Sequence, residues 1–280
     1  MPTSILGALL ALTSAAVWGS GDFSGGYATR GANNYHVLVL SALSGVILLV
    51  VLALVRHEGW PPLAGWVWAA LGGVSGAVGI ACLYQALSLG HAAAVAPITA
   101  VISAVLPAVF GMFLAGLPGP SQLAGFVVAA PGLWLVSAPT QGASRVSRAE
   151  MVLAVIAGLG FGGFFVFMGL LDRGYLFTPL VISRTLTLLT ALVLLAARRL
   201  PLPSLTSSPI ALLAGVLDAG GNIFYILARQ YARLDVAAVL SSLYPAATVL
   251  LSWIILKEHI GRRQWAGALL CVAAVALIAF

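Results

Sequence analysis

Apolar residues occupy ten long stretches of this sequence, and short polar links separate one stretch from the next. The stretches are residues 5–27, 35–55, 65–89, 92–116, 120–138, 150–171, 177–197, 209–229, 234–256 and 262–280. About 20 apolar residues suffice for a helix to cross roughly 30 Å of hydrocarbon. The pattern therefore predicts an all-α polytopic membrane protein with ten transmembrane helices, and a bacterial-type plasma (inner) membrane is its expected location.

Composition argues against a water-soluble domain of ordinary size. Hydrophobic residues make up 61% and charged residues 7% of the chain, against roughly 45–50% and about 25% in soluble proteins. The one lysine, Lys257, follows no glycine, so the phosphate-binding P-loop of many ATPases is missing. The net charge of +6 lies mostly in the short links, where basic residues orient a membrane protein. We therefore expect no nucleic-acid partner.

Cofactors and catalytic groups are not expected either. Cys82 and Cys271 lie inside apolar stretches without a CxxC spacing or neighbouring histidines, which favours small buried side chains. A membrane-embedded enzyme acting on lipids would need a dense group of acids or histidines. Seven acids scattered along the chain supply none, so we predict neither a metal site nor a catalytic centre.

The two halves of the chain show traces of a duplication. Arg30-Gly31 aligns with Arg173-Gly174 at a shift of 143 residues, and Gln122 aligns with Gln264 at a shift of 142. The expected parts are a first repeat at 1–138, a linker at 139–149 and a second repeat at 150–280. Because each repeat has five spans, an odd number, the second enters the membrane from the opposite side. Two inverted five-helix repeats are a common plan of secondary transporters.

Several motifs match one known family. Residues 18–23 (WGSGDF), residues 239–245 (VLSSLYP) and residues 256–258 (LKE), together with Tyr84 and Tyr225, resemble the EamA-like family of the drug/metabolite transporter superfamily. The resemblance implies a ten-helix carrier that moves small organic solutes, often amino acids, metabolites or drugs, without ATP. Gly116 stands where the family often places a glutamate, so the function of that glutamate is missing from the first half.

Charged residues inside the hydrocarbon are candidate functional groups because they are costly to place there. Asp22, Arg184 and Asp218 are three of them, although an ion pair that only locks helices together is the alternative. On span 209–229, Asp218, Asn222, Tyr225 and Arg229 are spaced to share one helix face, which should face a cavity. The matching face of span 65–89 carries Gly76, Ile80, Leu83 and Leu87 and is apolar. A cavity with one polar and one apolar wall suits an amphipathic solute.

Aromatic residues and a helix bend complete the candidate site. Trp18 corresponds to Phe161 and Asp22 to Phe165 at the shift of 143, with helix packing as the alternative role for the rings. Pro245 should bend the ninth span and free backbone carbonyls near Ser241 and Ser242. The candidate substrate-binding residues are Trp18, Asp22, Tyr84, Phe161, Phe165, Arg184, Asp218, Asn222, Tyr225, Ser241, Ser242, Tyr244 and Pro245. We expect spans one, three, four, six, eight and nine to surround the cavity.

The leading hypothesis is an ATP-independent exporter of a small amphipathic metabolite that works by alternating access, as a monomer or weak homodimer. Protons are the candidate coupling ion, with Asp218 as the proton or cation site and Arg184 as its charge partner. A lipid-headgroup flippase is the alternative. Eight basic residues in links on one side against four on the other would place both termini outside the cell, whereas the family resemblance implies that both lie inside.

Overall fold

The computed structural model describes residues 3–88, 92–138, 147–257 and 259–279, which form helices with no strand among them. Their bounds are α1 (Thr3–Ala28), α2 (Asn34–Val55), α3 (Leu63–Ser88), α4 (Ala92–Ala115), α5 (Pro120–Ser137), α6 (Arg148–Gly169), α7 (Thr178–Ala197), α8 (Pro209–Tyr231), α9 (Leu234–Ser241), α10 (Tyr244–Leu256) and α11 (Arg262–Ala279). Within the described residues, ten segments are long and apolar enough to span a membrane. The prediction of an all-α protein with ten spans is confirmed.

The ninth span is broken into α9 and α10, as the position of Pro245 predicted. Pro245 is the second residue of α10 and has no N–H, and its ring would clash with the carbonyl of Ser241, four residues earlier, in a continuous helix. The Ser242 amide still bonds the Ala238 carbonyl at 2.9 Å. The two helices therefore meet at Ser242 and Leu243, inside the protein rather than at its surface.

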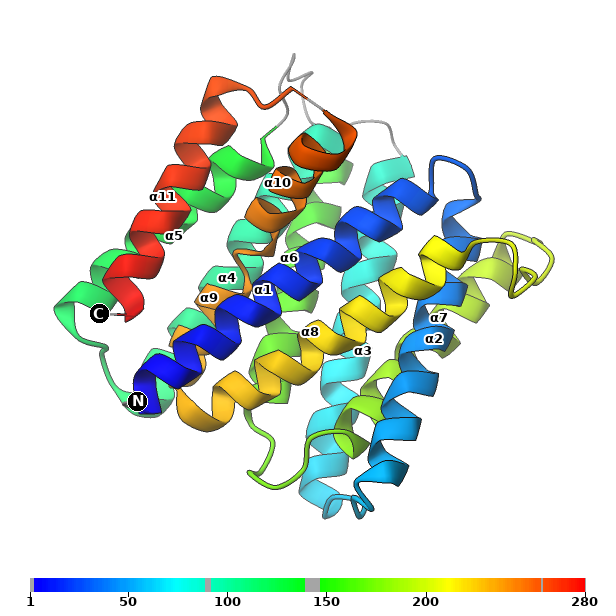
Figure 1. Cartoon of the computed structure of the whole chain (residues 1–280), viewed down its shortest axis with the longest axis horizontal. Helices are drawn as coiled ribbons and strands as arrows, with labels where there is room; N and C mark the ends of the chain where they lie inside the picture. Colours follow the sequence, from blue (N-terminus) through cyan, green and yellow to red (C-terminus); the bar gives the residue numbers. More distant parts are fainter. Residues whose placement is uncertain (1–2, 89–91, 139–146, 258, 280) are drawn as a thin grey trace.

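The two five-helix halves are inverted repeats. In Figure 1, α5 and α11 lie side by side and run in opposite directions, and both chain termini lie on the same side. Packing across the halves is reciprocal: α1 packs against α8 as α6 packs against α3, and α2 packs against α8 as α7 packs against α3. The halves therefore form one interlocked body rather than two separate bundles.

Glycine allows the closest of these helix crossings. A Cβ added to Gly160 on α6 would lie 2.7 Å from the Cα of Gly79 on α3. At the contact between α8 and α2, a Cβ added to Gly215 of α8 would overlap the Ser41 carbonyl and the Ser44 hydroxyl of α2. Close backbone approach of this kind drives helix association in lipid, where hydrophobic exclusion from water does not act.

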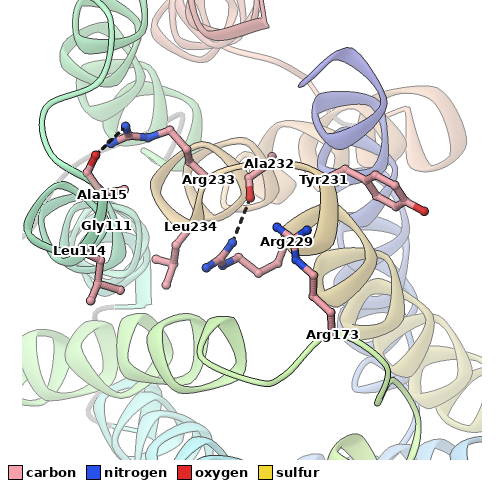
Figure 2. Close-up of a pocket in the computed structure, with 9 residues that line it drawn as sticks. All are labelled: Gly111, Leu114, Ala115, Arg173, Arg229, Tyr231, Ala232, Arg233 and Leu234. Atoms are coloured by element: carbon pink, nitrogen blue, oxygen red, sulfur yellow. Dashed lines mark hydrogen bonds between the residues drawn. The ribbon is translucent and has the colours of Figure 1, made fainter. Parts of the chain in front are cut away.

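Polar side chains satisfy the backbone at several helix ends. Ser147 and Glu150 form a reciprocal capping box, which explains why α6 begins two residues before the predicted start of span six. On the side of the termini, Arg229 donates to the Ala232 carbonyl at 3.1 Å and Arg233 donates to the Ala115 carbonyl at 3.2 Å, as Figure 2 shows. These bonds tie α4, α8 and α9 together where their helical hydrogen bonding stops.

Candidate functional site

A central cavity of about 440 Å³ lies between the two halves. Its lining residues belong to α1, α2, α3, α4, α6, α7, α8 and α10, while α5 and α11 contribute none. We expected spans one, three, four, six, eight and nine to surround the cavity. The omission of spans two and seven, which are α2 and α7, was wrong. These helices pack against each other and against α8 and α3, so their inner faces close one side of the cavity. The described lining residues are Trp18, Gly21, Asp22, Gly25, Gly26, Thr29, Asn34, Val37, Leu38, Ser41, Ala42, Gly76, Ile80, Leu83, Ser103, Phe161, Phe164, Phe165, Arg184, Thr187, Ala214, Asp218, Asn222 and Tyr244.

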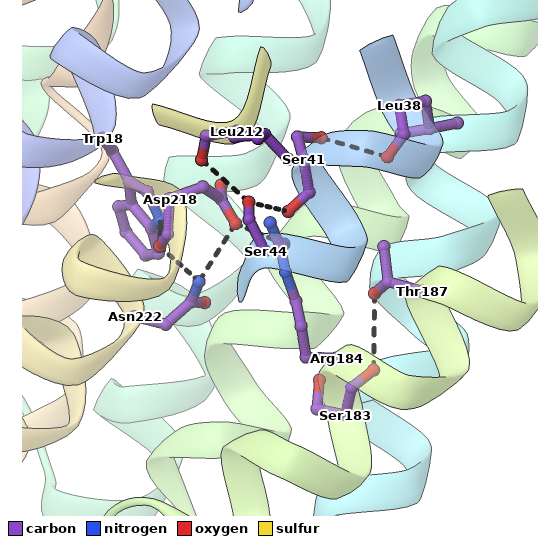
Figure 3. A network of polar contacts seen from close by, with 10 residues as sticks. All are labelled: Trp18, Leu38, Ser41, Ser44, Ser183, Arg184, Thr187, Leu212, Asp218 and Asn222. Carbon is purple, nitrogen blue, oxygen red and sulfur yellow. Dashed lines mark hydrogen bonds and ion pairs between the residues drawn. The ribbon is translucent and has the colours of Figure 1, made fainter. Parts of the chain in front are cut away.

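The polar wall of the cavity centres on an ion pair between Arg184 of α7 and Asp218 of α8 (Figure 3). The Asn222 side-chain amide donates to Asp218 Oδ2 at 3.3 Å and to the Asp218 carbonyl at 2.6 Å. Trp18 Nε1 donates to the same carbonyl at 3.1 Å. The expected pairing of the two charges is confirmed, and the neighbouring side chains fix the backbone on which Asp218 stands.

A second carboxylate lies on the same wall. Asp22 of α1 lines the cavity, and its side chain is exposed there. It lies close enough to Asp218 for the two negative charges to repel. It has no hydrogen bond or ion pair with any described residue. With Arg184, the wall carries two carboxylates and one guanidinium. An excess negative charge therefore faces the cavity when all three groups are ionised.

Aromatic rings form another part of the lining, next to the polar groups. Trp18 contacts Phe165 edge-on at a centroid distance of 5.3 Å, and it also meets Phe164 and Tyr244 at 6.5 and 6.3 Å. Phe161 lies beside them on the same cavity. Aliphatic residues of α2 and α3 also line the cavity, and Gly76, Ile80 and Leu83 of α3 do so as expected. The side chains of Leu87 and of the candidate Tyr84 lie outside the described residues.

Four of the described candidate residues do not line the cavity. Tyr225 is fully buried behind Trp18, and its hydroxyl donates to the Phe165 carbonyl at 2.5 Å. Ser241 donates to the Ala11 carbonyl and Ser242 to the Val239 carbonyl, both without exposure. Pro245 also lies outside the lining.

The polar stripe on α8 therefore has two roles. Asp218 and Asn222 face the cavity, whereas Tyr225 and Arg229 bond carbonyls of α6, those of Phe165 and Gly169. The spacing predicted the common face correctly, but the cavity ends after Asn222 and the stripe continues into the contact with α6. Its second half joins helices and does not line the site.

A sequence model of the EamA-like transporter family matches residues 5–138 and 148–280. This chain belongs to the EamA-like transporter family. The two matched segments coincide with the two five-helix halves, so the resemblance and the transport role that it implied are supported. One protein of known crystal structure superposes with a TM-score of 0.75 over 97% of this chain and 95% of its own, at 19% identity. That likeness supports the fold alone. None of the curated proteins compared with this chain matches it.

The cavity of this EamA-like transporter reaches one side of the protein. It extends to Thr29 and Asn34, around the link between α1 and α2, on the side opposite both termini (Figure 1). Its α1 and α2 lining residues all come from the halves of those helices nearest that side, and those of α8 end at Asn222, near the middle of that helix. Among the described residues, no lining residue comes from the helix ends on the side of the termini, so the cavity is closed there.

On the side of the termini, where the cavity is closed, a dense set of hydrogen bonds joins the α2–α3 link to the start of α7. We name this set the Glu58 latch. Glu58 Oε1, in the link between α2 and α3, accepts bonds from the backbone amides of Leu176, Phe177 and Thr178 at 2.8–3.0 Å and from the Thr178 hydroxyl at 2.9 Å. The carboxylate thus caps the positive N-terminal end of α7.

The inverted repeat places an equivalent link on the other side of the membrane. There His36, near the start of α2, bonds the Pro201 carbonyl of the link between α7 and α8 at 3.0 Å. Among the described residues, Glu58 and Gly59 accept five hydrogen bonds from Leu176, Phe177 and Thr178 at the closed side, whereas the equivalent position on the open side has the bond from His36 to Pro201. This asymmetry matches the one-sided cavity.

The site also contains residues that the sequence did not single out. Ser41, Ser103, Thr187 and Phe164 line the cavity, but single hydroxyl residues and phenylalanines are common in membrane helices and carry no pattern. Among the described residues no group of three or more His, Cys, Asp or Glu could hold a metal ion. The groups that the described lining presents to the cavity are the ion pair, Asp22, hydroxyl groups and aromatic rings.

Proposed function

We propose that this EamA-like transporter exports a small amphipathic solute, such as an amino acid or a drug-like amine, across a bacterial-type plasma membrane. The observation that carries the proposal is the division of the central cavity. Asp22, Asp218 and Arg184 supply charged groups, and aromatic and aliphatic side chains cover much of the remaining lining. A volume of about 440 Å³ falls within the range of small-molecule pockets, ~300–1,000 Å³.

The charge of the polar wall favours a solute with a positive group. Arg184 neutralises Asp218, which leaves Asp22 without an opposite charge among the described residues. A protonated amine near Asp22 would restore neutrality, while the apolar part of the solute would rest on Phe161 and Trp18. A carboxylate on the same solute could exchange with Asp218 as the partner of Arg184, which would accommodate a zwitterion.

Alternating access is the mechanism that best fits the fold. Inverted repeats allow the two halves to exchange conformations, so that a cavity open to one side can become open to the other. The unequal closures support this assignment, because Glu58 Oε1 accepts four hydrogen bonds at the closed side, whereas His36 forms one described bond at the equivalent position. Proton binding at the Asp218–Arg184 pair is the proposed coupling step.

Flux measurements in proteoliposomes test the proposal. The purified protein would be reconstituted and supplied with radiolabelled amino acids and small aliphatic or aromatic amines, with and without an imposed pH gradient. We expect saturable flux of at least one amphipathic amine or zwitterion, accelerated by the gradient. Asp172→Asn is the control for the variant Asp22→Asn, because it removes an exposed carboxylate that lies outside the central cavity.

Three results would contradict the proposal or a part of it. Flux that is equal in protein-free vesicles and proteoliposomes for every solute would exclude a carrier of this class. Scrambling of a labelled phospholipid, without flux of any amine or amino acid, would instead assign the protein to lipid translocation. Normal flux after removal of the Asp22 carboxylate, in Asp22→Asn, would exclude the proposed role of that residue.

A further inference from the structure

A second cavity of about 220 Å³ lies at the ends of membrane-spanning helices on the side of the termini. It is formed where α4 ends, where the link from α6 to α7 begins, and where α8 meets α9 (Figure 2). Three arginines, Arg173, Arg229 and Arg233, line it together with small and apolar residues. The central cavity shares none of these residues, so this is a separate site.

The three guanidinium groups differ in their partners. Arg233 is neutralised by Asp235, with its Nη2 at 2.8 Å from the carboxylate, and the hydrogen bond to Asp235 raises the pKa of Arg233. Arg229 donates to the carbonyls of Gly169 and Ala232 at 3.0 and 3.1 Å and forms no ion pair with any described residue. Its charge is therefore held in place but not neutralised.

Arg173 supplies a second charge without a counter-ion. Its side chain is exposed and forms no hydrogen bond or ion pair with the described residues. It lies close enough to Arg229 for the two positive charges to repel (Figure 2). Asp172 lines an adjoining cavity with both arginines, yet it forms no ion pair with either of them in the part of the chain described.

Two neighbouring guanidiniums without a counter-ion, at the mouth of a cavity, match an anion with several acceptor oxygens. Arginine binds phosphate through paired, charge-assisted hydrogen bonds. The surroundings also fit the depth of a lipid headgroup, because the exposed Leu114 and Tyr231 flank the cavity at the ends of membrane helices. We propose that this cavity binds a phosphate group through Arg173 and Arg229, and that an anionic phospholipid supplies it.

Native mass spectrometry of the full chain in a neutral detergent tests the site. Phosphatidylglycerol and phosphatidylcholine with identical acyl chains would be titrated separately, and the dissociation constant of the first bound lipid measured. We expect tighter binding of phosphatidylglycerol, and about a tenfold loss of that affinity in Arg173→Gln. The matched control is Arg56→Gln, which removes an exposed positive charge on the same side of the membrane, outside both cavities.

A competition measurement distinguishes a lipid headgroup from free inorganic phosphate as the source of the bound phosphate group. Displacement of phosphatidylglycerol by millimolar inorganic phosphate would assign the site to free phosphate, and its persistence would assign the site to the lipid. Equal affinity for the two lipids in the unaltered protein would overturn the proposal. So would equal losses in Arg173→Gln and Arg56→Gln, because net charge rather than this cavity would then govern binding.

Discussion

Removal of the Glu58 latch should shift the transporter toward the conformation that opens on the side of the termini. Three backbone amides and one hydroxyl converge on a single carboxylate oxygen of Glu58. Hydrogen bonds to a charged group contribute about 1.5–3 kcal/mol each in favourable cases, and a carboxylate at a partly buried helix N-terminus adds up to about 2 kcal/mol. Water can replace part of this because Glu58 is only half-buried.

We therefore expect Glu58→Ala to weaken the closed arrangement by about 2–3 kcal/mol and Glu58→Gln by about 1–2 kcal/mol, since Gln keeps an acceptor oxygen but loses the charge. If the latch forms only in the present conformation, these losses change the ratio of the two conformations roughly 5- to 150-fold. A conformation that is rare in the unaltered protein would become measurable in Glu58→Ala.

Pulsed electron spin resonance distances provide the assay. Spin labels at Arg56→Cys and Tyr175→Cys, in a background without Cys82 and Cys271, would report the separation of the two links that the latch joins. We expect one dominant distance in the unaltered protein, a longer second distance in Glu58→Ala, and a smaller share of it in Glu58→Gln. His36→Ala, which removes the bond to the Pro201 carbonyl on the open side, should not produce the longer distance.

An unchanged distance distribution in folded Glu58→Ala would refute this reasoning. It would mean that the latch bonds form in both conformations, or that other contacts dominate the closed side.

Two further predictions concern packing and the apolar wall. Gly215→Ala should lower stability by about 1–3 kcal/mol, measured as thermal unfolding in detergent, because the added Cβ overlaps α2. Gly26→Ala, with no atom within 4 Å of the added Cβ, is its control, and equal shifts would contradict the argument. Phe161→Ala should raise the KM for an aromatic or aliphatic solute more than it lowers protein level, because this ring faces the cavity. Trp18→Ala should raise the KM and also lower the protein level, because Trp18 is buried among four other rings. Normal transport by both variants would make these rings packing residues.

The sequence predicted the features that depend on chemistry in hydrocarbon. Ten apolar runs had to become ten spans, and Arg184 and Asp218 needed a partner because isolated charges inside the membrane are costly. Pro245 marked the break in span nine for a similarly local reason, since it lacks an N–H and collides with the preceding turn. These conclusions require no knowledge of how the helices are arranged.

Features that depend on the arrangement of helices could not be predicted. The spacing on α8 placed Asp218 and Tyr225 on one face, but only the position of α6 decides that the cavity ends between them. Ser241 and Ser242 looked available for binding, yet α1 and the preceding turn use their hydroxyl groups. The Glu58 latch joins residues almost 120 positions apart, so no local pattern could identify it.

The central claim is that the Arg184–Asp218 pair acts in transport and does not only hold α7 against α8. Removing one charge of a buried pair costs up to about 3–5 kcal/mol, less where the cavity admits water, whereas removing both charges is often tolerated. Asp218→Asn or Arg184→Gln alone should therefore reduce membrane yield, and the double variant should restore it.

The most direct test is the pH-driven flux of that double variant, Asp218→Asn with Arg184→Gln, compared with the unaltered protein at matched yield in proteoliposomes. Restored yield together with lost response to the pH gradient is the result that we predict. Restored yield together with restored pH-driven flux would contradict the claim and leave the pair a structural element.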